Sequence, residues 1–279
     1  MRDVIVRNPQ VGRALQPVSH AMHRSDYAIV DAVPAHAPNS KGSVAALAHL
    51  TLLSAQQTFP FLVELLDGLG SEALPVRAAA DFCQTDEQRT AAAQLKVLFD
   101  RYGSDKSNDH DYHLVYGAIV DRHCRAILEI GLGTNNDDVP STMGRNGSPG
   151  ASLRAFRDYL LDAQVYGADV DRRVLFQEER ISTFFVDQTD LGSVRDLAGW
   201  LPGDLDLIID DGLHSPAANI AILNLAASKL RVGGWVVVED IGAAAVPVWQ
   251  VVAVLLGQRY DCSIVQAADG VLFLANRRS

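Results

Sequence analysis

The sequence predicts an α/β protein built on a doubly wound, mostly parallel sheet of seven strands, with a smaller helical region before it. Two observations carry this prediction. From residue 126 onward, short apolar runs alternate with amphipathic stretches, as strands and crossover helices do in βαβ units. The last two runs are separated only by Asp269 and Gly270, which predicts a two-residue hairpin and an antiparallel end to the sheet.

Seven apolar runs account for the predicted strands. They cover residues 126–130, 164–170, 181–187, 205–211, 235–240, 262–268 and 270–276. Helical stretches separate the first five, at residues 150–163, 171–180, 193–201 and 215–230. Because strand and helix alternate in this way, the first five strands are expected to run parallel.

The region before the sheet has a different pattern. Between residues 44 and 100 apolar residues recur at spacings of three and four, and Asp86 with Glu87 is typical of a helix start. Residues 1–43 carry scattered Pro, His and Asn and predict an arm or a short helix. We therefore expect a helical domain over 1–98 and a sheet domain over 99–279. The apolar helices of the first domain predict a homo-oligomer.

Composition narrows the function classes. The 279 residues are 48% hydrophobic, enough for a large core, and the net charge is −10 with a pI near 5.2. An acidic surface repels nucleic-acid phosphates and anionic lipid, so neither partner is expected. The three cysteines form no metal or disulfide pattern. The apolar stretch 50–66 is interrupted by polar residues and there is no secretory signal, so we expect a soluble cytoplasmic protein.

The first three strand ends carry the pattern of a nucleoside site. Glu129 precedes Gly131 and Gly133, which allow a tight turn against a ligand, but no third glycine follows to cradle a diphosphate. The loop after the turn is acidic at Asp137 and Asp138, which suits a cationic ligand. Asp169 ends the second strand, where acids bind ribose hydroxyls. Asp187 and Gln188 end the third, facing an adenine edge. This combination indicates S-adenosylmethionine.

The motifs EIGLG, GADVD, VDQTD, IDDGLH and VVEDI resemble those of class I S-adenosylmethionine-dependent methyltransferases, which have a Rossmann-like fold. More narrowly, they resemble the magnesium-dependent sugar O-methyltransferases of macrolide biosynthesis, of the mycinamicin and macrocin type. The resemblance covers about residues 100–279. It implies a methyl transfer from S-adenosylmethionine to a sugar hydroxyl, with a glycosylated small molecule as the acceptor.

The fourth and fifth strands end in acids: Asp210 and Asp211, then Glu239 and Asp240. If these strands are neighbours, Asp211, Glu239 and Asp240 converge, and clustered carboxylates need a cation to offset their repulsion. Oxygen ligands without cysteine favour Mg²⁺ or another hard divalent ion. Asp210, on the opposite face, is expected to lie on the cofactor side or to buttress the turn.

His214 is the candidate general base, because it stands three residues after Asp211 and just before Ser215 and Pro216, a predicted helix start. The resemblance implies the same role for His214 and a metal-ligand role for the three acids. The alternative for each is structural: acids at strand ends can simply face solvent, and an isolated histidine can be a packing residue.

The segment 101–123 precedes the first strand and contains GSDK, a sequence that relatives share. Tyr102 and Lys106 are expected to cover the methionine end of the cofactor, with Lys106 at its carboxylate; Tyr112 and Tyr116 are candidates for the same surface. The long loop 134–150 is expected to be a lid over the site or a variable surface loop. Trp249 belongs to the core or to the wall of the acceptor pocket.

Three other functions remain open from the sequence. The first is a catechol or small-phenol O-methyltransferase, which the long loop after the first strand disfavours. The second is a non-catalytic S-adenosylmethionine-binding subunit, which would not need the clustered acids. The third, a nicotinamide dehydrogenase, is disfavoured by the missing third glycine and by the terminal hairpin.

Overall fold

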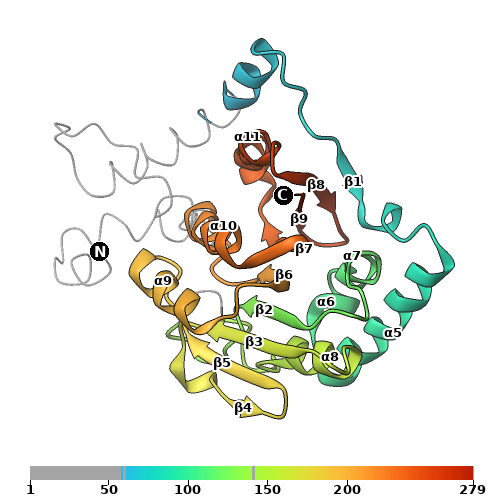
Figure 1. The fold of residues 1–279 in the computed structure, drawn as a ribbon, viewed down its shortest axis with the longest axis vertical. Coiled ribbons are helices and arrows are strands. Elements are labelled where there is room, and N and C mark those ends of the chain that lie inside the picture. The colour runs from blue at the N-terminus through green and yellow to red at the C-terminus, as the bar shows by residue number, and fades with distance from the viewer. Residues whose placement is uncertain (1–57, 59–60, 140–141, 279) are drawn as a thin grey trace, which may run out of the picture.

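The computed structural model describes residues 58, 61–139 and 142–278 (Figure 1). The expected arm or helix in residues 1–43 and most of the apolar stretch 50–66 lie outside them. Nine strands of the described chain form one sheet in the order β1-β8-β9-β7-β6-β2-β3-β5-β4. The strands are β1 (Val76–Ala78), β2 (Ala126–Ile130), β3 (Gln164–Asp169), β4 (Gln177–Glu178), β5 (Ile181–Phe185), β6 (Leu205–Asp210), β7 (Leu230–Ile241), β8 (Tyr260–Gln266) and β9 (Val271–Arg277).

The centre of the sheet confirms the predicted fold class. Strands β7, β6, β2, β3 and β5 pair in parallel, and β9 pairs antiparallel with both β7 and β8. All seven predicted strands are present. Two more, β1 and β4, were not predicted, because runs of three and two residues are too short to show an apolar period. The helix predicted over 171–180 is wrong: this stretch forms a short 3-10 turn at Arg172–Val174 followed by β4. The hairpin loop is also longer than predicted: Gln266 pairs with Val271, so four residues connect the strands.

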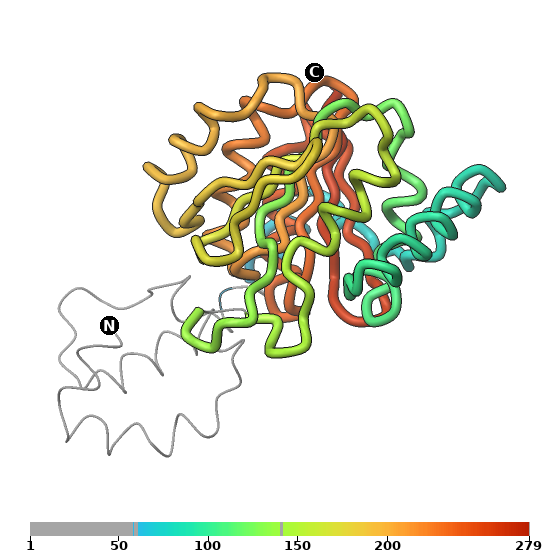
Figure 2. Tube along the Cα trace, turned by 90° about the horizontal axis from the view of Figure 1, so that it is seen from below, coloured from blue at the N-terminus to red at the C-terminus, as the bar shows by residue number. Residues whose placement is uncertain are grey.

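Helices cover both faces of the sheet. The longer ones are α5 (Asp86–Tyr102), α7 (Tyr112–Ile119), α8 (Ala151–Tyr159), α9 (Leu191–Trp200), α10 (Pro216–Lys229) and α11 (Val246–Leu256), with α6 (Asp105–Asn108) between α5 and α7. One buried cluster joins α5, α7 and α8 to the sheet, and another joins α9, α10 and α11 to its other face. Figure 2 shows α5 on the side of the sheet away from α9 and α10. The result is a three-layer α/β/α arrangement.

Helix α5 begins as predicted and then crosses the expected domain boundary. Thr85 and Gln88 form a capping box at its start, and Gly103, with a φ of 76°, ends it. Phe99 on this helix is fully buried in the same cluster as Tyr116 of α7 and Phe156 of α8. A boundary at residue 98 would therefore cut α5 inside the core, and β1, which pairs with β8, also lies before it. The described part of the chain does not divide there.

Among the described residues, no helix has both the length and the apolar character needed to cross a bilayer.

Candidate active site

The predicted site residues lie at the carboxyl ends of neighbouring strands. Strand β6 pairs in parallel with β2 on one side and β7 on the other, which confirms that the fourth and fifth predicted strands are adjacent. Glu129 on β2, Asp210 on β6 and Glu239 on β7 thus belong to one edge of the sheet, where open α/β sheets bind ligands. The side chains at this edge separate into an outer group and an inner group.

The outer group consists of Asp211, His214 and Asp240. One donor atom from each lies within 4.8 Å of the others, and His214 Nε2 is 3.8 Å from a carboxylate oxygen of Asp240. Each side chain is a fifth to a third exposed. The group is thus an arrangement of two carboxylates and one imidazole that solvent can reach and that could hold a divalent ion.

The inner group surrounds Lys106. Its Nζ lies 2.6 Å from Asp211 Oδ2 and 3.2 Å from Glu129 Oε1, and it donates a hydrogen bond to Glu239 Oε2. Lys106 and Glu239 are each 1% exposed and Glu129 is fully buried. Burial alone would lower the pKa of Lys106, but the charges of Asp211, Glu239 and Glu129 outweigh burial and raise this pKa well above its usual range. Lys106 is therefore a permanent cation.

The structure does not bring Glu239 into the outer group, although the sequence predicted it as a metal ligand beside Asp240. Neighbouring residues of a strand point to opposite faces, so Glu239 and Asp240 cannot both face outward in regular β structure. Strand β7 is also irregular here: its register against β9 shifts between Val238 and Ile241, and Asp240 has a φ of 53°. Glu239 therefore points to Lys106 and Asp240 to His214.

Two tyrosines of α7 fix the acids of β7. The Tyr112 hydroxyl donates to Asp240 Oδ1 and the Tyr116 hydroxyl to Glu239 Oε1. Burial and the adjacent carboxylates raise the pKa of both phenols, so they remain proton donors. From the sequence, Tyr112 and Tyr116 were candidates for covering the cofactor. Their hydrogen bonds to the acids of β7 were not predicted, because a spacing of four residues shows only that the two side chains share one face of a helix.

The glycine turn after β2 contacts the acid cluster directly. Gly131 and Gly133 have φ values of 90° and 77°, which favour glycine. The Gly131 amide donates to Ala168 O at 2.8 Å, and the Asp211 amide donates to Ile130 O at 2.8 Å. A Cβ atom at residue 131 would lie 2.5 Å from the Asp211 carbonyl carbon. The turn predicted for the cofactor and the turn that holds Asp211 are therefore packed against one another.

Two further predicted cofactor residues, Asp169 and Asp187, have partners that fix them. Asp169 accepts hydrogen bonds from the amides of Leu132 and Asp171, at 2.8 and 2.7 Å. Asp187 accepts from the amide and hydroxyl of Thr189, at 2.9 and 2.6 Å. Each carboxylate has lone pairs left for a ligand.

Asp210 and Gln188 hold the turn after β6. Gln188 Nε2 donates to Asp210 Oδ1 at 2.7 Å, and Gln188 Oε1 accepts from the Leu213 amide at 2.9 Å. Asn219 of α10 donates to Asp210 Oδ2 at 3.0 Å. Asp210 is fully buried, and burial raises its pKa to about 6. Of the two positions expected for Asp210, on the cofactor side or in the turn, these contacts correspond to the turn, and its contact with the cofactor stays a prediction.

Comparison with known proteins bears on this geometry. No family model matches the chain. A tetracenomycin rhamnosyl 2'-O-methyltransferase of Streptomyces olivaceus is 33% identical over 151 residues, which are 54% of this chain and 38% of that protein. An L-olivosyl-oleandolide 3-O-methyltransferase of Streptomyces antibioticus is 35% identical over 149 residues, 50% of this chain and 35% of that protein. The chain thus spans less than two fifths of the length of these curated relatives.

The structural comparison decides the fold. The mycinamycin-pathway methyltransferase MycE, solved in complex with Mg and SAH, superposes with a TM-score of 0.53 at 22% identity, over 66% of this chain and 55% of that chain. The described chain has the class I methyltransferase fold. The resemblance of the sequence motifs to class I methyltransferases is therefore confirmed for the fold.

One predicted residue lies away from the strand ends of this methyltransferase fold. The Tyr102 hydroxyl donates to Asp158 Oδ2 at 2.5 Å, and Asp158 stands near the end of α8 rather than at its start. Tyr102 is the last residue of α5, and the chain then turns at Gly103 before Lys106, so proximity in sequence does not bring the two side chains to one place. The structure does not place Tyr102 at the cofactor turn.

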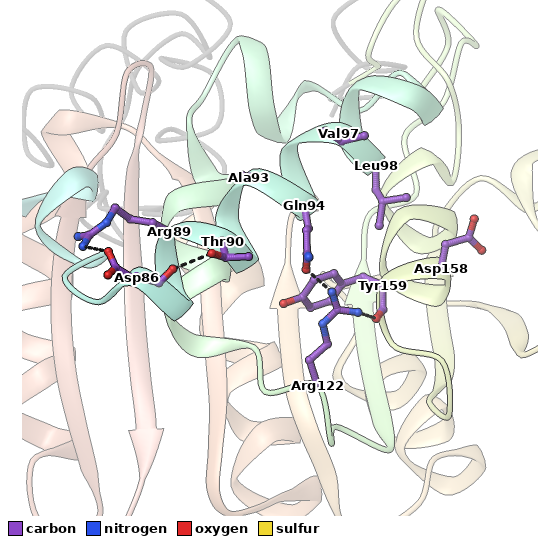
Figure 3. A pocket seen from close by; sticks show the side chains of 10 residues that line it. All are labelled: Asp86, Arg89, Thr90, Ala93, Gln94, Val97, Leu98, Arg122, Asp158 and Tyr159. Carbon is purple, nitrogen blue, oxygen red and sulfur yellow. Dashed lines mark hydrogen bonds and ion pairs between the residues drawn. The ribbon is translucent and has the colours of Figure 1, made fainter.

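An open groove lies remote from the strand ends. It has a volume of about 820 Å³ and lies along α5 and the end of α8 (Figure 3). Its polar lining residues mostly contact one another: Arg89 pairs with Asp86 at 2.5 Å, and Arg122 donates to Tyr159 O at 2.7 Å. None of the predicted site residues lines it. The groove therefore shares no lining residue with the acid cluster at the strand ends.

The long loop after the glycine turn is tied to the segment that follows β3. Thr134 and Asn136 both donate to Asp171 Oδ2 at 2.7 Å, and Arg173 pairs with Asp171 at 2.6 Å and Asp138 at 2.9 Å. The start of the loop thus has a defined position, while its role as a lid stays a prediction. Trp249 is 1% exposed and stacks near Phe273, so it belongs to the core.

Proposed function

We propose that this protein is an S-adenosylmethionine-dependent O-methyltransferase that methylates a sugar hydroxyl of a glycosylated small molecule with the help of Mg²⁺ or another divalent ion. One observation carries the proposal. In a methyltransferase fold, the backbone of Asp211, one of the three residues of the outer group, packs directly against the glycine turn at Gly131. A hydroxyl acceptor held at the outer group would therefore lie beside a methyl donor held at the turn.

The residues at the strand ends fit the two groups that this chemistry needs. For S-adenosylmethionine, the turn at Gly131 and Gly133 leaves backbone space, and Glu129 Oε1 is a buried acceptor with no hydrogen bond among the described residues. For the ion, three acids surround the single cation Lys106, and burial together with the neighbouring carboxylates raises the pKa of Glu239 well above its usual range; a divalent ion would offset this crowding of acids. Asp169 would bind the ribose, and Asp187 and Gln188 the adenine edge.

The chain's own residues supply position and proton transfer. Asp211 and Asp240 would hold the ion, and Glu239, the third predicted ligand, could join them only by leaving Lys106. A bound ion would lower the pKa of the acceptor hydroxyl. His214 Nε2 faces Asp240 at 3.8 Å and is placed to take the hydroxyl proton as the methyl group transfers. His214 keeps this orientation through its own backbone, with a φ of 54° at the start of α10.

Two related proteins support the choice of a sugar acceptor. The Streptomyces relatives are named for methylation of a rhamnosyl and an olivosyl group. A catechol or phenol acceptor is the second candidate, and a non-catalytic binding subunit is the third. Turnover of S-adenosylmethionine with a panel of deoxysugar glycosides and catechols, with and without EDTA, separates all three. The proposal expects EDTA-sensitive turnover on the glycosides; cofactor binding without turnover on any acceptor would support the binding subunit.

Replacing His214 with alanine tests the mechanism. We expect kcat to fall by roughly 10²–10⁴-fold, because the general base is lost, with S-adenosylhomocysteine affinity unchanged. His123→Ala is the matched control, since His123 is exposed on the turn before β2 and should leave kcat intact. A His214→Ala variant as active as this control would remove His214 from the mechanism.

We further propose that the protein acts in the cytoplasm as a homo-oligomer. Phe61, Leu65 and Leu69 are 57–71% exposed and recur every four residues, so they present one apolar stripe to solvent. Such a stripe is suited to pairing with a second copy. Sedimentation of the wild-type chain and of a Leu65→Glu variant tests the assembly, and a monomeric wild-type chain would contradict it.

A further inference from the structure

We infer that Asp171 is a positioning residue of the cofactor site: its buried carboxylate fastens the start of the loop 134–138 to the end of β3, where Asp169 is proposed to bind the ribose. The inference rests on the proposed function in one respect, the binding of S-adenosylmethionine at this edge of the sheet. It involves neither the divalent ion nor the acceptor.

The carboxylate of Asp171 accepts hydrogen bonds from two segments of the chain. From the loop, Thr134 Oγ1 and Asn136 Nδ2 each donate to Oδ2 at 2.7 Å. From the turn after β3, Arg173 donates to Oδ1 through Nε at 2.6 Å and to Oδ2 through Nη2 at 3.0 Å. The hydrogen bonds from Arg173 hold the pKa of Asp171 well below its usual range, so the carboxylate stays charged. Hydrogen bonds to a charged acceptor are the stronger kind, so Asp171 holds the loop firmly.

Asp169 and Asp171 hold the same stretch of chain at two points. Asp169 Oδ2 accepts from the Leu132 amide at 2.8 Å, and Asp169 Oδ1 accepts from the Asp171 amide at 2.7 Å. The Asp171 side chain then binds Thr134, two residues further along the loop, which is itself 2% exposed. Because the Leu132 amide orients Asp169, a loop that is released at Thr134 would also disturb the carboxylate proposed to bind the ribose.

Asp138 contacts the same arginine in a different setting. Arg173 Nη2 lies 2.9 Å from Asp138 Oδ1, but the Asp138 side chain is 72% exposed, whereas Asp171 is 4% exposed. An exposed ion pair contributes little to stability, because water screens the charges. The connection between the loop and β3 therefore depends on the buried Asp171 and not on the exposed pair.

A loop that is already fixed favours ligand binding. A ligand that must order a loop loses part of its interaction free energy to that ordering, and a preorganised site avoids this loss. Asp171 would thus strengthen cofactor binding through Asp169 and the loop, without a contact of its own to the cofactor.

The test measures the Kd for S-adenosylhomocysteine by calorimetry, below the unfolding temperature of each variant. Asp171→Asn should raise this Kd about 10-fold or more, because charge-assisted hydrogen bonds are lost. Glu178→Gln is the matched control, since Glu178 is a partly exposed carboxylate that pairs with two arginines of α8. Both variants lose ion pairs and should lose stability, but Glu178→Gln should leave the Kd unchanged. A purely structural role for Asp171 would not separate the two.

Thr134 provides a second, milder series. Thr134→Val keeps the shape of the side chain but loses the hydrogen bond to Asp171, and should raise the Kd about fivefold. Thr134→Ser keeps the hydroxyl and should change the Kd by less than about twofold. In the Asp171→Asn background, Thr134→Val should add less than about twofold, because the two residues act through one contact. This series decides the matter if Asp171→Asn does not fold.

The inference and the proposed function fail in distinguishable ways. A Kd that Asp171→Asn leaves unchanged, or that Thr134→Val and Thr134→Ser raise equally, would overturn the positioning role while the proposed function stands. No binding of S-adenosylhomocysteine by the unaltered chain would remove the cofactor, and with it both the proposed function and this inference.

Discussion

Replacing Gly131 with alanine should damage the fold and the acid cluster together. Gly131 has a φ of 90°, and a Cβ there would lie 2.5 Å from the Asp211 carbonyl carbon and 2.9 Å from Gly212 Cα. The nearest atom is the Asp211 carbonyl oxygen, at 2.0 Å, and real Cβ atoms essentially never come within 3.0 Å of such backbone atoms, so the Asp211 backbone must move by about 1 Å. Because Asp211 carries an oxygen of the outer group, its carboxylate moves with it.

The magnitude follows from two costs. A left-handed backbone at a non-glycine residue costs about 1–2 kcal/mol, and overpacking costs about 1–3 kcal/mol more. The free energy of unfolding should therefore fall by about 2–5 kcal/mol, which corresponds to a fall in Tm of roughly 4–20 °C for a domain of this size.

Gly233→Ala is the matched control. Gly233 has a φ of 78°, but only the flexible end of Arg231 lies near its Cβ position, at 3.1 Å. This variant should lose only the backbone cost, about 1–2 kcal/mol, and keep its Mn²⁺ affinity. Thermal unfolding followed by circular dichroism, together with an Mn²⁺ titration, measures both effects. If the two variants unfold at the same temperature and bind Mn²⁺ equally, the coupling between the glycine turn and Asp211 is wrong.

Two other predictions concern stability. The pKa of Asp210 in the folded chain, about 6, lies above its unfolded value of about 3.9, so the carboxyl destabilises the fold as pH rises from 4 to 6. Asp210→Asn removes this titration, so between pH 4 and pH 7 its free energy of unfolding, measured with urea, should fall by about 2 kcal/mol less than that of the wild-type chain; an equal fall in both would contradict the raised pKa. Trp249→Ala should lower the free energy of unfolding by about 3–5 kcal/mol, because it empties a core position. Its S-adenosylhomocysteine affinity, measured by calorimetry below the unfolding temperature, should not change, and a selective loss of affinity would place Trp249 at the ligand.

The sequence predicted the parts of the fold that local patterns encode. The seven runs became strands because their apolar residues are buried on both faces of a parallel sheet, as on β6, where all six residues are buried. The adjacency of β6 and β7 followed from the βαβ pattern. Strands β1 and β4 were missed because their few residues have no strand-like composition of their own. β1 forms by pairing with β8, which is distant in the sequence, and β4 by pairing with the longer strand β5.

The sequence predicted which residues gather at the strand ends better than it predicted how their side chains are arranged. Asp211 and Asp240 lie close together, as predicted from the strand ends, with His214 beside them, but Glu239, which was predicted to join the two aspartates, contacts Lys106 and Tyr116 instead. The division between Glu239 and Asp240 depends on the irregularity of β7, which no residue spacing signals. Lys106 and Glu239 stand 133 positions apart, so their contact depends on how α6 packs over the sheet. Long-range contacts of this kind are set by tertiary packing and not by local periodicity.

Strand β1 limits how this chain can be shortened. Its three residues, Val76–Ala78, pair with Ile264, Val265 and Gln266 and so cover the outer side of β8. A fragment that starts at residue 99 would lose this cover together with most of α5, and would present the bare amides of β8 to other molecules. Uncovered edges recruit further strands and lead to aggregation. A truncated chain intended for crystallisation or engineering should therefore begin upstream of Val76.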